Sequence, residues 1–219
     1  MRRNKTLPTL QSLSTMLDVD NPPKGGERSK KFRWLDNQGR MLTAGGLLPY
    51  DEDGIWAIGE INKDDVLFTD MGGKYQFEDG SIYQTIAREA YEETYGMLEL
   101  TRSVVESYYS KYPVVYVNGH KNKPVYSCVV VPIGVLNVDL NNDIFTAKRL
   151  AVIKSNPDVP PGYYNSVCIR HLSFAEINSA KHQLSYRLRR VLKYGPFSSK
   201  VDITVLSTPS SSPTPPEVC

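Results

Sequence analysis

SIYQTIAREAYEETYG, residues 81–96, is the stretch of sequence that decides the expected fold. Ser81 suits the N-cap of a helix, because its hydroxyl can accept a hydrogen bond from a free N–H of the first turn. Apolar residues recur at every fourth position, at Ile82, Ile86 and Ala90. Gly96 suits the left-handed position after a helix end. We therefore predict a helix from about Ser81 to Tyr95 that buries one apolar face.

Strand-forming segments lie on both sides of this helix. Predicted strands before it cover residues 42–49, 54–61 and 66–68, and those after it cover 104–109, 114–117, 125–133 and 166–172. Residues 137–165 are polar and rich in proline, so we expect a long loop that shapes a substrate mouth. The order of strands, helix, strands and helix predicts an α+β fold, a mixed α/β sandwich with a mixed sheet between helices.

A second helix is predicted after the last strand. Ser173 and Glu176 match a capping box that opens it, and Gly195-Pro196 ends it. Its apolar stripe consists of Ile177, Leu184, Leu188 and Val191. The basic residues on its other face are expected to be solvated; they are Lys181, Arg187, Arg189, Arg190 and Lys193.

Composition divides the chain into three parts. We expect residues 1–40 to be a flexible N-terminal extension, 41–196 to be the folded domain, and 197–219, rich in Ser, Thr and Pro, to be disordered. We find neither a signal-like apolar run near the N-terminus nor an apolar stretch of 18 residues. We therefore expect a cytoplasmic protein that does not bind membranes. The formal net charge of +2 creates no requirement for nucleic acid either.

Three glutamates of the predicted helix share one face. Glu89, Glu92 and Glu93 are spaced so that their carboxylates converge and repel one another. Arg88 can pair with Glu92 four residues on, but one arginine cannot neutralise three carboxylates. A divalent cation is the natural complement, and oxygen-only ligands favour Mg²⁺ or Mn²⁺. The alternative is a charged helix face that is simply solvated.

Two glycines, Gly72 and Gly73, stand at the end of the predicted strand before this helix. Without side chains they let the backbone approach a ligand and leave carbonyl oxygens free for a metal. A glycine loop that leads into a carboxylate-bearing helix is a specific arrangement. It favours the metal-site hypothesis over a merely solvated surface.

The stretch from Gly73 to Gly96 resembles the Nudix box of the Nudix hydrolase superfamily. The family pattern is glycine, five residues, glutamate, seven residues, then Arg-Glu-apolar-x-Glu-Glu-x-Gly. Here Gly73 is followed by five residues and Asp79, then by eight residues and Arg88-Glu89-Ala90-Tyr91-Glu92-Glu93. The first acid is therefore an aspartate (or Glu78 in a shifted register), one residue is inserted before Arg88, and Gly96 comes one residue late. The resemblance covers residues 41–194 and describes a divergent member.

The resemblance implies a pyrophosphohydrolase that cleaves the diphosphate linkage of a nucleoside diphosphate derivative with Mg²⁺ or Mn²⁺. It implies that the metal is bound by the Gly72 carbonyl and by Glu89, Glu92 and Glu93. Arg88 would orient a glutamate through an ion pair, Gly73 would permit a turn, and Asp79 would be supportive. An acid, base or ligand from outside the box is also implied, with candidates Asp139, Asp143 and Glu176.

Several alternatives stay open. Nucleotide sugars, dinucleotides, nucleoside triphosphates, inositol pyrophosphates and capped RNA are all candidate substrates. The basic segment 28–33 and the basic last helix slightly favour the RNA cap, without deciding it. The expected partner is a small-molecule nucleotide, and a homodimer is common in the family. The alternative functions are a catalytically silent Nudix-fold binding module and an interaction domain whose acidic helix is a partner surface.

Overall fold

The computed structural model describes residues 34–36, 39–62, 65–118, 124–158, 164–179, 183–202 and 204, all within one unit, Phe32–Cys219. Most of the expected extension, residues 1–40, and most of the expected tail, residues 197–219, lie outside the described residues. The basic segment 28–33 lies outside them as well.

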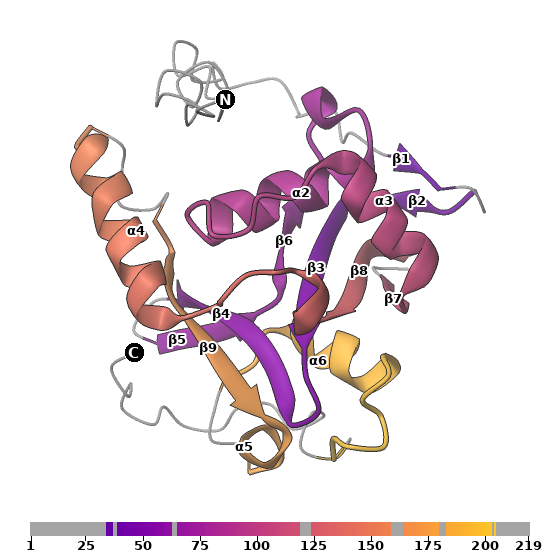
Figure 1. Cartoon of the computed structure of the whole chain (residues 1–219). Coiled ribbons are helices and arrows are strands. Elements are labelled where there is room, and N and C mark those ends of the chain that lie inside the picture. Colours follow the sequence, from indigo (N-terminus) through magenta and orange to yellow (C-terminus); the bar gives the residue numbers. More distant parts are fainter. Residues whose placement is uncertain are drawn as a thin grey trace, which may run out of the picture. The chain divides into compact units, whose positions relative to one another are not determined.

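The described chain is a mixture of strands and helices (Figure 1). The strands are β1 Trp34–Leu35, β2 Met41–Leu42, β3 Ala44–Tyr50, β4 Gly54–Asn62, β5 Asp65–Thr69, β6 Met71–Lys74, β7 Val114–Asn118, β8 Pro124–Pro132 and β9 Ser166–Ser173. The helices are α2 Ile82–Glu93, α3 Arg102–Lys111, α4 Asn142–Ser155, α5 Phe174–Asn178 and α6 Tyr186–Tyr194, with short 3-10 turns η1 Phe77–Asp79 and η3 Ile133–Val135. The predicted α+β class is confirmed.

The large sheet is mixed and divides into two arms, one built on β3 and the other on β4; the place where the arms separate is here called the fork. β3 pairs in parallel with β8, and β7 extends this arm antiparallel to β8. β4 pairs antiparallel with β9 and β5 in the other arm. Among the described residues, β3 and β4 pair at one register position, Tyr50 opposite Ile55. The chain through β5 and β6 spans the fork, because β5 lies along β4 and β6 lies along β3. Asp70 stands at the bend between them.

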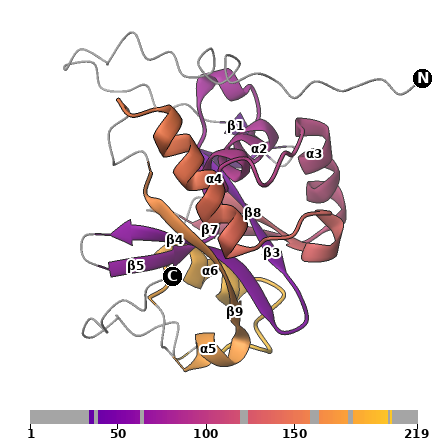
Figure 2. The ribbon, with the colours of Figure 1, turned by 60° about the vertical axis from the view of Figure 1, so that its left-hand side comes forward.

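Two apolar cores lie on the two faces of this sheet. Alternate residues of β8 divide between them, with Cys128 and Val130 in one core and Val129 and Val131 in the other. Figure 2 shows α2, α3 and α4 on one side and α5 and α6 on the other. The predicted apolar face of α2, made of Ile82, Ile86 and Ala90, is fully buried.

Both ends of α2 follow the sequence prediction closely. The Ser81 side chain accepts a hydrogen bond from the N–H of Gln84, so Ser81 is the N-cap. The helix ends at Glu93, and Gly96 is left-handed with φ 77°. Tyr95 before it is also left-handed, with φ 50°. The one-residue delay of Gly96 is therefore accommodated by a second residue in this conformation.

Two sequence predictions between α2 and β9 are wrong. Residues 104–109, predicted as a strand, lie in α3, which Thr101 caps and which packs Val105 into the core. Tertiary packing overrides the β-propensity of valine and tyrosine there. Residues 137–165, predicted as a loop, contain α4, capped by Asn141. Phe145 is its one fully buried residue, so the segment carries no clear apolar period.

The predicted second helix is two helices. The capping box of Ser173 and Glu176 is present and opens α5, which ends at Asn178. α6 starts anew after Ser185, whose side chain accepts a hydrogen bond from the N–H of Leu188. No helix in the described ranges is long and apolar enough to cross a membrane.

Candidate functional site

The three glutamates of α2 and a fourth from β4 line a pocket of about 200 Å³. This glutamate pocket is lined by Glu60, Glu89, Glu92, Glu93, Tyr95, Asn165 and Ser166. Helix α2 and the turn after it form one wall, and β4 and the start of β9 form the other. The structure thus brings together Glu89, Glu92 and Glu93, which the sequence singled out, while their chemical roles stay predictions.

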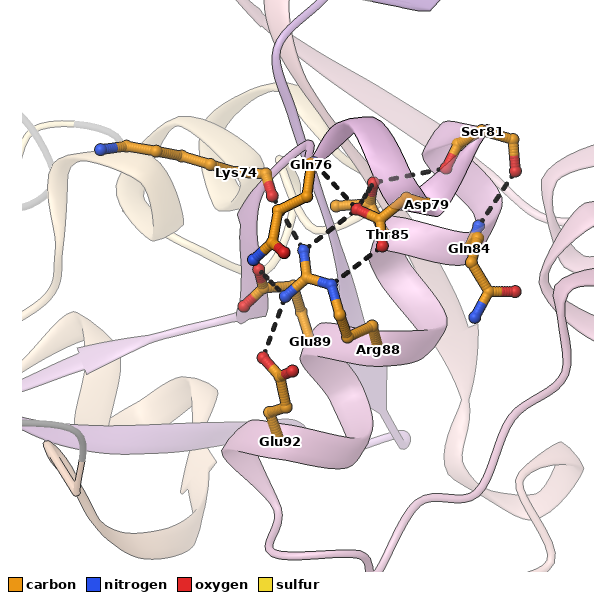
Figure 3. A network of polar contacts seen from close by, with 9 residues as sticks. All are labelled: Lys74, Gln76, Asp79, Ser81, Gln84, Thr85, Arg88, Glu89 and Glu92. Atoms are coloured by element: carbon orange, nitrogen blue, oxygen red, sulfur yellow. Dashed lines mark hydrogen bonds and ion pairs between the residues drawn. The ribbon is translucent and has the colours of Figure 1, made fainter. Parts of the chain in front are cut away.

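Arg88 holds one side of this pocket through the network in Figure 3. Its Nη1 donates to Glu89 Oε1 at 2.8 Å and to Glu92 Oε2 at 2.9 Å. Its Nη2 donates to the carbonyl oxygen of Lys74 at 2.9 Å. The ion pair of Arg88 with Glu92, expected from their spacing, is therefore present. A second one reaches Glu89, so a single guanidinium positions two carboxylates.

Asp79 completes the network from outside the pocket. Arg88 Nε donates to its Oδ1 at 2.9 Å, and the N–H of Gln76 and the hydroxyl of Thr85 donate to its Oδ2 at 3.0 and 2.8 Å. Burial raises the pKa of Asp79, but the hydrogen bonds from Arg88, Gln76 and Thr85 outweigh it and leave the pKa below 3.8. Asp79 is an ionised anchor that ties Arg88 to η1 and the first turn of α2.

Gly73 does not serve the role expected of it. It lies within β6, opposite Gly45 of β3, so the prediction that it permits a turn is wrong. A Cβ built on Gly73 would stand 2.4 Å from the carboxyl atoms of Glu89. Gly73 instead leaves the space that the Glu89 carboxylate occupies.

Gly72 contacts the site through its backbone. Its N–H donates to Glu93 Oε2 at 2.8 Å. Because the N–H and C=O of a strand residue point to the same side, its carbonyl faces the edge on which Glu93 lies. Gly72 stands opposite Gly46, next to the pair of Gly73 and Gly45. These four glycines are here called the glycine floor: Gly45 and Gly73 face α2, which packs closely on them, and a Cβ on Gly46 or Gly72 would meet the Tyr126 hydroxyl instead.

Burial raises the pKa of each glutamate in the pocket. For Glu89 and Glu92 the charge of Arg88 offsets part of this effect. For Glu60 and Glu93 the offset comes from Arg187. The pKa of Glu93 lies well above its usual value, because repulsion from Glu60 and Glu89 adds to its burial. Carboxylates packed in this way are stabilised by an added cation.

The donor chemistry of the pocket fits Mg²⁺ or Mn²⁺, which prefer carboxylate and carbonyl oxygens. As they stand in the described part of the chain, no three His, Cys, Asp or Glu side chains form a set that could hold an ion. Arg88 donates hydrogen bonds to Glu89 and Glu92, and the N–H of Gly72 donates one to Glu93. The Glu92 side chain is 48% exposed. An ion would be bound when these carboxylates exchange their present partners for it.

Glu60 is the carboxylate of the pocket that the sequence prediction missed. It lies where the pairing of β4 with β9 shifts register, so that Gly59 faces Cys168 and Glu60 faces Ser166. Such a bulge redirects side chains and is common beside active sites. The available signal was a single acidic residue in the otherwise apolar stretch GIWAIGEI, residues 54–61.

The three candidates for an outlying acid are not in the pocket. Asp139 and Asp143 are exposed and do not line it. The Glu176 carboxylate accepts hydrogen bonds from the N–H and hydroxyl of Ser173 at 2.9 and 2.8 Å and pairs with Arg170 at 3.2 Å. Ser173 lies opposite Gly54, at the far end of β4 from Glu60. Glu176 is a capping residue.

A buried ion pair lies in the fork of the sheet. Arg187 Nε donates to Asp70 Oδ1 at 2.6 Å, and its Nη2 donates to the Asp70 carbonyl and to Thr69 Oγ1, both at 2.9 Å. The hydroxyl of Tyr126 donates to the other carboxylate oxygen of Asp70. Arg187 was expected on a solvated face, which is wrong. It points inward and supplies the positive charge that Glu60 and Glu93 experience.

Comparisons with known proteins find distant likeness among solved structures. No protein-family model matches the chain, and no curated protein matches it. Among solved structures, the chain is similar to one described as a NUDIX hydrolase from Nitrosomonas europaea, with 15% identity and a TM-score of 0.40. The match covers 78% of this chain and 99% of that one. A likeness this low does not establish a family, and the function has to be inferred from the residues of the site.

Proposed function

We propose that the protein is a Nudix-type hydrolase that uses Mg²⁺ or Mn²⁺ to cleave the diphosphate linkage of a nucleoside diphosphate derivative. The observation that carries this proposal is the convergence of four glutamates, Glu60, Glu89, Glu92 and Glu93, on one pocket. The resemblance of residues 73–96 to the Nudix box supports the same reaction class.

The residues divide into binding and positioning roles under this proposal. Glu89, Glu92, Glu93 and the Gly72 carbonyl would hold the metal, and Arg88 positions Glu89 and Glu92. A bound ion of this kind neutralises diphosphate oxygens and acidifies a water molecule. We assign Glu60 as the proton acceptor for the attacking water, because it faces the α2 glutamates across the pocket. Its raised pKa suits general base catalysis near neutral pH.

The size of the pocket bears on how a substrate is held. At about 200 Å³ it is smaller than the pockets that usually enclose whole ligands. It suits the diphosphate group, while the remainder of a nucleotide would lie at the rim near Tyr95 and Asn165. A small-molecule nucleotide therefore remains the proposed substrate class.

The test is phosphate release in a coupled phosphatase assay. The panel contains nucleotide sugars, dinucleotides, nucleoside triphosphates and capped RNA, each with Mg²⁺, Mn²⁺ or a chelator. We expect metal-dependent turnover that Glu92→Gln nearly abolishes and that Glu176→Gln, outside the pocket, leaves intact. Turnover by Glu92→Gln at the wild-type rate would contradict the metal assignment.

A catalytically silent binding module is the second candidate. The hydrogen bonds of the glutamates favour this candidate. Arg88 binds Glu89 and Glu92, and the Gly72 N–H binds Glu93, so the carboxylates are not arranged around an ion. Isothermal titration calorimetry with the same compounds separates the two. Nucleotide binding without turnover in any metal would support the module, and turnover would exclude it.

A further inference from the structure

A second surface with a defined chemistry lies on α6. This helix packs Leu188, Val191 and Leu192 into the core on the sheet face opposite α2. Its outer side carries Tyr186, Arg190, Lys193 and Tyr194, here called the α6 surface. Residues spaced by three, four and eight positions share one side of a helix, so these four side chains stand together.

The aromatic rings of the α6 surface are exposed and flanked by cations. Tyr186 is 61% exposed and Tyr194 is 53% exposed. The guanidinium carbon of Arg190 lies 5.7 Å from the ring centroid of Tyr186 and 4.7 Å from that of Tyr194. Lys193 Nζ lies 5.6 Å from the Tyr194 ring. Arg190 thus stands between two flat rings and restrains both of them.

No carboxylate in the described part of the chain neutralises the charge of this surface. Helix α6 contains no acidic residue. Within the described residues, neither Arg190 nor Lys193 forms an ion pair with a carboxylate. Arg187, on the inner side of the same helix, pairs with Asp70 instead. The outer cations are therefore available to an anionic partner.

We propose that the α6 surface binds single-stranded RNA. Unpaired bases stack on exposed aromatic rings and on arginine planes, while lysine and arginine neutralise the phosphates between the bases. The order Tyr186, Arg190, Tyr194 along the helix alternates a ring, a cation and a ring. Such an alternation matches a chain that alternates bases and phosphates.

Other anionic partners fit this surface less well. A helix that lies in a membrane interface inserts an apolar face, but the apolar face of α6 is already buried in the core. An acidic peptide would use the cations and leave the exposed faces of both rings uncovered. RNA uses both features, and its 2′-hydroxyl can exchange hydrogen bonds with the tyrosine hydroxyls.

The test is fluorescence anisotropy of the full chain with a labelled single-stranded RNA. We expect salt-sensitive binding that is stronger than binding of the same sequence as a duplex, because a duplex hides its base faces. Tyr186→Ala and Tyr194→Ala should each weaken binding roughly tenfold. Tyr186→Phe and Tyr194→Phe keep the rings and should stay within a few fold of wild type.

Matched controls use exposed residues elsewhere. Phe77→Ala removes a ring that is 67% exposed, and Lys154→Gln removes an exposed cation of α4. Both should leave the affinity for RNA unchanged, whereas Arg190→Gln with Lys193→Gln should reduce both the affinity and its salt dependence. Absence of wild-type binding, or equal affinity of wild type and both alanine variants, overturns the proposal. The proposal is also overturned if polyaspartate binds as tightly as the RNA, or if phosphatidylserine vesicles bind and the RNA does not.

Discussion

The carboxylate of Glu89 occupies the space that a side chain on Gly73 would need. A Cβ on Gly73 would lie 2.4 Å from three atoms of that carboxyl group. The two residues come from different elements, β6 and α2, whose close approach places Glu89 over the strand. The position of a proposed metal ligand therefore depends on the absence of a group elsewhere in the chain.

Gly73→Ala should displace Glu89 and lower both stability and metal-dependent hydrolysis. Overpacking of this kind costs about 1–3 kcal/mol in unfolding free energy. Gly134→Ala is the matched control, because a Cβ at Gly134 meets nothing within 4 Å. Urea unfolding should show lower stability for Gly73→Ala, and the phosphate-release assay should show lower activity. Gly134→Ala should match wild type in both measurements. Equal behaviour of the two variants would remove the steric argument.

Glu60→Gln should reduce metal-dependent hydrolysis roughly a hundredfold or more, the usual contribution of a general base. Glu176→Gln should keep full activity and lose about 0.3–1.5 kcal/mol of stability, because it removes a capping-box carboxylate. The coupled phosphatase assay and thermal unfolding measure the two effects separately. An active Glu60→Gln enzyme together with an inactive Glu176→Gln enzyme would restore the original candidate and reject Glu60.

Glu93→Gln should make the metal-free protein more stable than wild type at neutral pH. The folded-state pKa of Glu93 is raised, so its contribution to stability is fully present below 4.5, its ordinary value, and is lost as pH rises above it. The glutamine keeps an oxygen for the N–H of Gly72. The melting temperatures of the two proteins should be equal at low pH. As pH rises to neutral, the melting temperature of Glu93→Gln should become the higher one.

Mg²⁺ should reverse that order by stabilising wild type and leaving Glu93→Gln unchanged. A chelator should restore the metal-free difference. A melting temperature of wild type that does not respond to Mg²⁺ or Mn²⁺ would count against a metal at Glu93, whatever the activity.

Asp79→Asn should destabilise the protein by about 1.5–3 kcal/mol at neutral pH, because it weakens charged hydrogen bonds to Arg88. Since the pKa of Asp79 is lowered, its contribution is present above 3.8 and disappears as pH falls through the folded-state value. Urea unfolding over decreasing pH should show wild type and variant converging below 3.8. A constant difference at all pH values would mean that the charge of Asp79 is irrelevant.

Arg187→Gln should cost about 3–5 kcal/mol, since it leaves Asp70 charged and buried. Lys193→Gln on the same helix should stay within about 0.5 kcal/mol of wild type. Chemical unfolding of both variants checks the difference. Similar losses of unfolding free energy in the two variants would mean that Arg187 is solvated, as the sequence predicted.

The elements that the sequence predicted well carry their own local signals. Helix α2 has an N-cap serine, an apolar period of four and a terminal glycine, and α5 has a capping box. Helix α4 has one buried residue, Phe145, so its stability depends on contacts with β9 that no local pattern reveals. Helix α3 contains two valines and two tyrosines, which favour strands, and packing against α2 decides its conformation.

The site was predictable where its residues share one helix. Glu89, Glu92 and Glu93 follow from spacing along α2, as does the pair of Arg88 with Glu92. Glu60 reaches the same pocket from β4 through a register shift with β9. Arg187 reaches Asp70 across 117 positions of sequence. Such contacts depend on strand pairing and on the fork of the sheet, which periodicity along the chain does not encode.

The glycine floor also limits which sequences can encode this protein. A Cβ on Gly46 would lie 1.9 Å from the Tyr126 hydroxyl, and one on Gly72 would lie 2.5 Å from the Gly45 carbonyl oxygen. Gly46 has no proposed role in the chemistry and Gly72 acts only through its backbone, yet almost any side chain at either position would collide with its surroundings. Mutational tolerance should therefore be as low at positions that lend no side chain to the chemistry as at the glutamates, and a saturation library would measure this.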